Sequence, residues 1–289
     1  MKSAHAVLAF AILLVTLGCR DLGTASDPQQ GGSRPLTSIE RSLVSSGNTF
    51  GFALFNSVNR TESGRNLFIS PVSVSLAFGM TLNGARGATR DSIARTLALA
   101  GLSQTDINAS YKSLIALLTT LDPVVAMQIA NSIWNRPDLN VQQDFKDLNA
   151  EYFNASVRSL NFADPTAAKT INGWVDENTH GRITEIVQDP IPTDMVMYLI
   201  NAIYFKGSWT YRFDSTATRD DSFFPSSGSR TSCRMMFQGG SYSYFSNDEV
   251  QVVDLPYGQG NFTATIVLPS SNSNIESFSQ SLTQEKWNG

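Results

Sequence analysis

The sequence contains few of the residues on which most catalytic and metal sites depend. Of its 289 residues, two are cysteine, two are histidine and 16% are charged. An acyl-transfer site needs a base, and beyond the first residues the chain offers only His180, beside Gly181 at a predicted helix end. A surface or capping position is the simpler interpretation of that histidine. The sequence also has no G-x-S-x-G, P-loop or H-E-x-x-H motif, so it gives little support to an enzyme.

Clusters of basic residues are missing as well. The chain has 21 Lys and Arg against 25 Asp and Glu, a net charge of −4. Nucleic acid and other polyanions need a concentrated positive surface, so we expect no nucleic-acid partner. One histidine and one thiol, with no carboxylate cluster, also predict no metal site and no cofactor. The hydrophobic content of 42% supports a sizeable core, in one large domain or two small ones.

No apolar run is long enough to span a bilayer, and the longest lies at the N-terminus. Lys2 precedes an apolar stretch over 6–17, which ends at Cys19 within the tripeptide LGC. This ending resembles the lipobox of bacterial lipoproteins, although Thr16 stands where that motif has an aliphatic residue. We expect residues 1–19 to be a signal peptide with lipidation at Cys19, and plain secretion is the alternative. Either way the protein is exported, and a lipid anchor would be its one contact with a membrane.

The two cysteines do not predict a disulfide framework. Pairing of Cys19 with Cys233 is allowed by counting alone, and the alternative is one processed cysteine and one partly buried thiol. The segment 20–40 is rich in Gly, Ser, Pro and Gln and has no hydrophobic period, so it is interpreted as a flexible tether. The remaining residues, 41–289, are assigned to one folded domain.

Helix signals dominate the first half of the domain. Phe50, Leu54 and Val58 recur every four residues, which predicts a helix over 43–58. At Ser70-Pro71 the hydroxyl can cap a helix while proline occupies the first turn, where its missing N–H costs nothing. Further helices are predicted over 91–99, 103–121, 142–153 and 164–181, and from 275 onward.

Strand signals dominate the second half. The nearly unbroken apolar run 195–205 predicts a strand covered on both faces. Two strands are predicted to pair within 231–246 around Gly239-Gly240, and a turn-rich connection predicts a hairpin of 251–255 with 262–268. Other strands are predicted over 124–134 and 156–162. Helices first and strands later, around a buried central strand, indicate an α+β fold.

Motifs spread over more than two hundred residues resemble those of the serpin family of protease inhibitors, in the family's order. They are 66–73 (NLFISPVS), 76–80 (LAFGM), 84–89 (GARGAT), 130–134 (ANSIW), 171–175 (INGWV), 178–183 (NTHGRI), 199–209 (LINAIYFKGSW), 235–238 (MMFQ), 253–257 (VDLPY) and 266–269 (IVLP). The resemblance implies N-terminal helices packed on a large central β-sheet, with smaller β-sheets beside it. It also implies a monomer whose partner is a serine or cysteine protease.

The resemblance implies a mechanical rather than an enzymatic mechanism. A serpin presents a loop that the protease attacks to form an acyl-enzyme, and the cut loop then inserts as a new strand in the central sheet. Ser70, Ser73 and Asn201 match the family's shutter, a polar patch beneath the parting strands. Trp209 matches its breach, where insertion begins. The plainer alternatives are a helix cap for Ser70, a satisfied buried amide for Asn201 and an ordinary core aromatic for Trp209.

The sequence departs from the family at its end. Serpins continue past the position of Trp287 through further strands and the reactive loop, so the reactive centre and the C-terminal strands are expected to be absent from this chain. We therefore expect the sequence to be a fragment of a longer inhibitor. The alternatives are a non-inhibitory serpin that acts as a binding protein, and an exported enzyme of unrelated fold.

Overall fold

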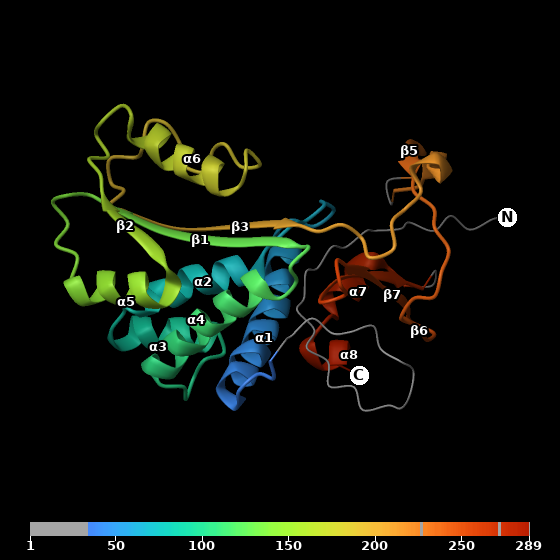
Figure 1. Cartoon of the computed structure of the whole chain (residues 1–289), viewed down its shortest axis with the longest axis horizontal. Helices are drawn as coiled ribbons and strands as arrows, with labels where there is room; N and C mark the ends of the chain where they lie inside the picture. The colour runs from blue at the N-terminus through green and yellow to red at the C-terminus, as the bar shows by residue number, and fades with distance from the viewer. Residues whose placement is uncertain (1–33, 226–227, 271–272, 289) are drawn as a thin grey trace.

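A three-stranded sheet separates one group of helices from a single helix in the computed structural model (Figure 1). The structure describes residues 34–225, 228–270 and 273–288, so the predicted signal peptide, Cys19 and most of the predicted tether lie outside it. Most helices lie against one face of the sheet and a single helix, α6, lies over the other face. A second group of strands follows on the C-terminal side. Within these described ranges, no helix is long and apolar enough to cross a membrane.

Helix α1 (Ser38–Thr61) begins inside the segment predicted as a tether. The Thr37 side chain accepts from the Glu40 backbone N–H, and the Glu40 carboxylate accepts in return from the Thr37 backbone N–H. This reciprocal capping box fixes the start of the helix, so residues 38–40 are helical. The predicted tether over 20–40 therefore ends too late, since its last three residues belong to α1. Its composition is polar, but the T-x-x-E pattern that begins at Thr37 is a helix-start signal.

The helices on the main face begin where the sequence signals lie. Ser70 caps α2 (Pro71–Leu82) by accepting from the Ser73 N–H, with Pro71 in the first turn. Ser103 caps α4 (Gln104–Thr120) in the same way. Helix α5 (Gln143–Phe153) matches its predicted range. Helix α3 (Gly87–Thr96) starts one turn earlier than the predicted 91–99, because the polar stretch that precedes Asp91 is also helical.

The central sheet has the strand order β2-β1-β3 in the described residues. Strand β1 (Ala126–Asn135) pairs in parallel with β2 (Ala155–Ser159) and antiparallel with β3 (Met197–Lys206). A core cluster fills the space between the main face of this sheet and the helices. Its fully buried members include Met80, Ile107, Ile133 and Phe153, contributed by α2, α4, β1 and α5.

The second face of the sheet is covered over only part of its length (Figure 1). Helix α6 (Ala167–Asn178) packs there on a separate cluster with Trp134 and Ile200. Most residues of β3 are therefore half-buried, whereas the sequence predicted full burial on both faces. An unbroken apolar run does not distinguish these two situations. Helix α6 also begins later than the predicted Asp164, which forms a turn by accepting from the Thr166 backbone N–H at 2.8 Å.

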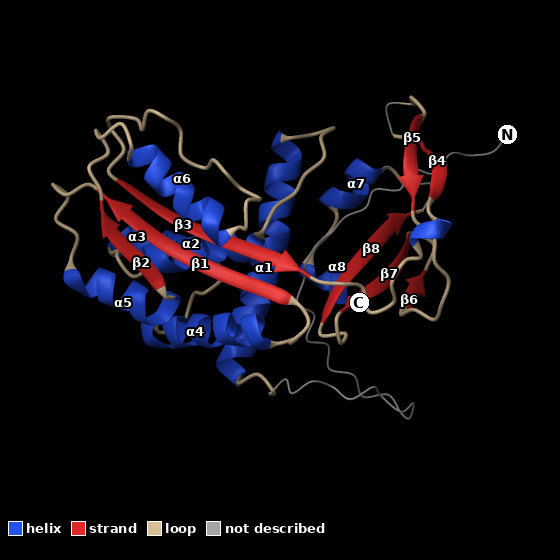
Figure 2. Cartoon of the chain, turned by 45° about the horizontal axis from the view of Figure 1, so that its top comes forward, coloured by secondary structure: helices blue, strands red, loops and turns tan. Residues whose placement is uncertain are grey.

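The C-terminal part consists of short strands in two further sheets (Figure 2). Its elements, in order, are a 3₁₀ turn (Ser215–Ala217), β4 (Arg219–Phe223), β5 (Thr231–Met235), β6 (Tyr244–Ser246), β7 (Val250–Tyr257), β8 (Phe262–Pro269), α7 (Ile275–Gln280) and α8 (Gln284–Asn288). The hairpin β7–β8 is confirmed. The predicted pairing within 231–246 is wrong, because β5 pairs with the preceding β4 and β6 pairs with the following β7.

A buried carboxylate joins the C-terminal hairpin to the helical part. Asp122, which follows α4 and is 3% exposed, accepts from the Gln259 backbone N–H at 2.7 Å and from the Val124 N–H at 3.1 Å. The hairpin turn approaches so closely that a Cβ atom at Gly258 would lie 2.7 Å from the Asp122 carboxylate, at a φ of +55°. This turn therefore requires glycine.

Candidate functional site

The two serines predicted to form the shutter lie together at the start of α2. The Ser70 hydroxyl accepts from the Ser73 backbone N–H at 3.3 Å and donates to the Ser73 hydroxyl at 2.9 Å. Ser70 is exposed, and so is the neighbouring Phe68, whose exposure is 88%. The segment that leads into α2 thus presents the Ser70 hydroxyl and the Phe68 ring on the surface, while Ser73 in the first turn is half-buried. The capping role considered for Ser70 is confirmed.

The third predicted shutter residue, Asn201, lies in the middle of β3. It stands directly opposite Asn131 of β1, and its amide donates to the Asn131 side-chain oxygen at 2.8 Å. Asn131 in turn donates to the backbone carbonyl of Phe153 at 2.7 Å. The side-chain oxygen of Asn201 is buried and has no hydrogen-bond partner among the described residues. Asn201 is therefore a buried amide that is only partly satisfied, which differs from the satisfied amide of the plainer interpretation.

The structure places the serine pair and the asparagine pair on two elements in contact. Helix α2 packs against β3 through the core cluster that contains Leu76 and Leu199. Within the described residues no hydrogen bond joins the serines to Asn201. Sequence reasoning missed Asn131 as the partner of Asn201, because the two residues are 70 positions apart. Only the antiparallel register of β1 and β3 brings them together.

Strand β3 forms one border of the sheet (Figure 2). All ten of its residues pair with β1, and its other edge has no strand partner in the part of the chain that the structure describes. An edge strand presents N–H and C=O groups to which a further strand can bind. The partly satisfied Asn201 belongs to this border strand. Strand addition at β3 is therefore an action that the geometry permits.

The predicted breach residue, Trp209, lies just beyond the end of β3. Its ring stacks on Tyr257 with the centroids 4.2 Å apart and the planes at 15°, and Phe213 meets it edge-on at 5.9 Å. Gly207 is needed for this packing, because a Cβ atom there would lie 2.9 Å from the Tyr257 ring. Trp209 therefore anchors the end of β3 to the hairpin β7–β8.

The single histidine of the described residues also bears on the sheet. His180 follows α6 with a φ of +51°, is exposed, and forms a hydrogen bond of 2.8 Å between Nε2 and the Gln128 side-chain oxygen on β1. Its ring meets Tyr204 of β3 at 4.3 Å. The surface position predicted for His180 is confirmed. Its contacts with both central strands could not be foreseen from the sequence.

The remaining residues considered for chemistry are the two cysteines and any metal ligands. Cys233 on β5 is half-buried and pairs with no other cysteine of the described residues, which leaves both interpretations of the two cysteines as predictions. No group of three or more His, Cys, Asp or Glu side chains within the described ranges could hold a metal ion. Cys19, the predicted lipidation site, lies outside the described residues. The site is thus an unpaired strand border with supporting polar residues, within the described part of the chain, rather than a set of reactive groups.

Comparison with known proteins identifies this arrangement. The family model described as "Serpin (serine protease inhibitor)" matches residues 45–289. The chain belongs to the serpin family. Human serpin B8 is 32% identical over 253 residues, which is 85% of this chain and 66% of that protein. Rat serpin A12 is 34% identical over 234 residues, which is 80% of this chain and 56% of that protein. The chain therefore spans less than two thirds of these relatives' length.

A solved structure supports the same fold. Reactive-loop-cleaved human thyroxine-binding globulin superposes with a TM-score of 0.80 at 26% identity, covering 87% of this chain and 76% of that one. The α+β serpin fold predicted from the sequence is thus confirmed. This fold contradicts the unrelated fold that the alternative of an exported enzyme required. The shutter and breach roles of Ser70, Ser73, Asn201 and Trp209 in this serpin stay predictions.

Proposed function

We propose that the protein containing this chain is an inhibitory serpin that traps a serine or cysteine protease. In this proposal the protease attacks a loop expected beyond Gly289, and the cut loop inserts in the central sheet as a strand beside β3. Asn201, Asn131, Ser70 and Ser73 would exchange hydrogen-bond partners as the strand arrives. No nucleic acid, metal or cofactor takes part, and the protein would act as a monomer.

The proposal rests on two features of β3, namely its outer edge and its central amide. Its outer edge is unpaired in the described residues, and one oxygen of its central Asn201 is buried without a partner. Each hydrogen bond gained by an added strand is worth about 0.5–1.5 kcal/mol net, so about a dozen would supply ample driving force. Polar side chains that can change partners suit such a transition better than an apolar plug.

The test is the formation of a covalent complex. The protein from the complete reading frame would be incubated with a panel of trypsin-, chymotrypsin-, elastase- and papain-like proteases. An inhibitory serpin should give a complex that survives SDS, together with a released C-terminal peptide. Cleavage of the protein without any such complex would contradict inhibition and favour the non-inhibitory alternative. Bulky or charged residues in the hinge of the loop would favour that alternative too.

A shutter variant sharpens this test. Asn201→Leu removes the partner-exchanging amide, so a larger fraction of molecules should be cleaved without trapping the protease. The matched control is Asn140→Ala, which removes an exposed amide from the loop after β1. Equal trapping by Asn201→Leu and by the unmodified protein would argue against the shutter role while leaving inhibition itself intact.

We also propose that the protein is exported and anchored through a lipid on Cys19. The support is the sequence of residues 1–19, with its basic residue, its short apolar run and LGC ending. Labelled palmitate should be incorporated by the unmodified protein and not by Cys19→Ala. Release of an unlabelled protein into the medium would favour plain secretion instead.

A further inference from the structure

The middle of α6 is joined to the segment that follows the helix by one amide side chain. The Asn172 side-chain oxygen accepts from the backbone N–H groups of Ile186 and Val187, each at 2.9 Å, and its Nδ2 donates to the Val187 carbonyl at 2.8 Å. Within the described residues, the backbones of Ile186 and Val187 have no other hydrogen-bond partner. Because Val187 is 2% exposed, its backbone groups would be buried and unpaired without Asn172.

The end of α6 has a second link to the same segment. Thr179, which is 1% exposed, donates its hydroxyl to the Val175 carbonyl at 2.8 Å and accepts from the Ile183 backbone N–H at 3.0 Å. The chain then returns, and Val187 packs in the apolar cluster beneath α6. Residues 167–187, here called the α6 flap, are therefore held together by hydrogen bonds and by a shared core.

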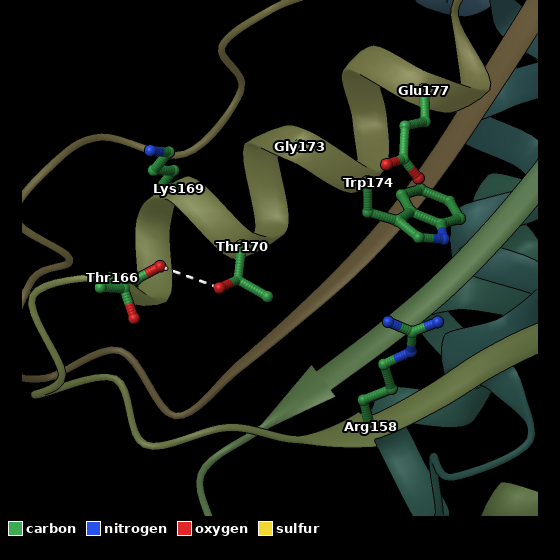
Figure 3. Close-up of a pocket in the computed structure, with 7 residues that line it drawn as sticks. All are labelled: Arg158, Thr166, Lys169, Thr170, Gly173, Trp174 and Glu177. Carbon is green, nitrogen blue, oxygen red and sulfur yellow. Dashed lines mark hydrogen bonds between the residues drawn. The ribbon is translucent and has the colours of Figure 1, made fainter.

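The α6 flap is attached to the central sheet less firmly than it is held together. Its buried side chains are small or aliphatic and pack on Trp134 and Ile200; those on the helix are Ala167, Ala168, Ile171 and Val175. The other side of the helix faces solvent, with Lys169 and Glu177 exposed (Figure 3). An open groove of about 400 Å³ lies between α6 and Arg158 of β2, so the helix lacks close packing on that side.

His180 makes the one hydrogen bond that joins the flap to the three central strands in the described part of the chain. Its Nε2 lies 2.8 Å from the Gln128 side-chain oxygen, and its ring meets that of Tyr204 at 4.3 Å. Gln128 and Tyr204 are directly opposite each other in the β1–β3 register. One side chain of the flap therefore contacts both central strands, at the end of the sheet that α6 itself does not cover.

The flap occupies space that a strand added beside β3 would need. Neighbouring strands lie about 4.7–4.9 Å apart, and every second side chain of the new strand would point to the face that carries α6. On that face the flap already covers Ile200 and Tyr204 of β3. The flap must therefore shift before the side chains of an added strand can pack.

We propose that the α6 flap moves as one body when a strand is added beside β3, with Asn172 as its internal brace and His180 as its latch to the sheet. This inference rests on the proposed inhibitory function. Both residues are positioning residues, because they act through the place of the flap and not on the protease or the cut bond. Firm internal bonds and a weak outer attachment are what such a movement requires.

The latch is tested by native-state amide hydrogen exchange on the chain as it stands, without any protease. His180→Asn removes the ring and keeps a residue type that tolerates the positive φ of 51°. Exchange of the α6 amides and of Ile186 and Val187 should rise together by about threefold to tenfold, since one hydrogen bond and one ring contact are lost. The amides of β1 and β2 should keep their rates.

Two results would overturn the latch. An equal rise in the flap and in the strands would mean that His180 stabilises the whole fold. No rise in the flap would mean that His180 does not hold it. The matched control is Arg182→Ala, which removes an exposed side chain two positions away and should leave every rate unchanged.

The brace is tested by Asn172→Ala in the same experiment. Exchange of Ile186 and Val187 should rise, because their amides lose their acceptor, while the α6 amides keep their rates. In the double variant with His180→Asn, the two groups of amides should no longer respond by the same factor. Parallel responses in the double variant would show that Asn172 does not unite the flap, and would overturn its role.

The link to inhibition is tested with the protein from the complete reading frame and a protease that it traps. His180→Asn should trap a larger fraction of the protease than the unmodified protein, because a released flap delays the added strand less. An unchanged or smaller fraction would overturn this link, and Arg182→Ala should have no effect. If the unmodified protein forms no complex with any protease, the proposed inhibition fails, whereas the exchange rates still decide whether the flap is one body.

Discussion

Residues 34–206 and 207–288 bury their apolar side chains to very different degrees. In the first region, helices and sheet enclose two core clusters, with fully buried residues such as Ile133 and Ile171. In the second region, the buried apolar residues are Val250, Phe262, Ala264, Phe278 and Leu282. Large exposed ones there include Tyr211, Phe224, Met236, Tyr244 and Phe245.

The difference shows how neighbours decide burial. Strand β1 has a strand on each side, and its second half, residues 131–135, lies between helices on both faces of the sheet and is buried. Strand β6 is a three-residue border strand with a partner on one side only, and all three of its residues are exposed. Comparable strand-forming residues thus contribute very differently to stability. Core substitutions in the first region should therefore have the largest effects.

The largest effect is expected from Phe153→Ala. Phe153 is 0% exposed and its ring lies 5.2 Å from that of Tyr111, with Gly79 so close that a Cβ atom there would be 3.0 Å away. The substitution should lower the free energy of unfolding by about 3–5 kcal/mol, because it leaves a cavity. Urea denaturation at neutral pH measures this.

The control in the second region is Tyr244→Ala, which removes an aromatic side chain that is 60% exposed. It should change the free energy of unfolding by about 0.5 kcal/mol or less. Similar losses from Phe153→Ala and Tyr244→Ala would break the comparison between the two regions.

An intermediate effect is expected where the two regions meet. Gly258→Ala places a Cβ atom against the Asp122 carboxylate and Val125, at a positive φ. We expect a loss of about 2–4 kcal/mol from this overpacking and backbone strain. Gly260→Ala is the matched control, since its φ is +92° but nothing lies within 4 Å. It should lose only about 1–2 kcal/mol, from strain alone. Equal losses would show that contact with Asp122 is unimportant.

The smallest effect concerns a charge within the first region. Glu40 is 3% exposed and accepts from Arg34 at 2.5 and 2.8 Å, and the Arg34 guanidinium holds the pKa of this carboxyl well below its usual value of 4.5. A folded pKa below the unfolded one stabilises the protein above pH 4.5. That contribution is lost as the pH falls from 4.5 toward the folded value.

Glu40→Gln tests this contribution, because glutamine keeps the capping box while losing the charge. At pH 7 the variant should be less stable than the unmodified protein, and the difference should shrink steadily below pH 4.5. Denaturation curves between pH 7 and 3 measure it. A difference that is constant over this range would exclude the ion pair as its source. Glu62→Gln, in an exposed pair with Arg65, is the control and should show little effect.

Local signals accounted for much of the fold. Each of these signals depends on a few neighbouring residues. The structure confirms the cap at Ser70, the proline after it and the turn between β7 and β8. The pairing of β5 was mispredicted, because alternation and turn residues do not specify which neighbouring strand will be the partner. The family resemblance rested on motif order and was likewise readable from the sequence.

Local patterns and motif order predict the α+β plan, the main helix starts, the β7–β8 turn, the family and the candidates Ser70, Ser73, Asn201 and Trp209. Which residues these candidates contact depends on how distant segments pack. Asn201 meets Asn131 across 70 residues of chain, Trp209 stacks on Tyr257, and Arg158 faces α6. Caps and turns depend on interactions between near neighbours, so sequence patterns predict them. Contacts between distant segments depend on register and packing, which no local pattern contains.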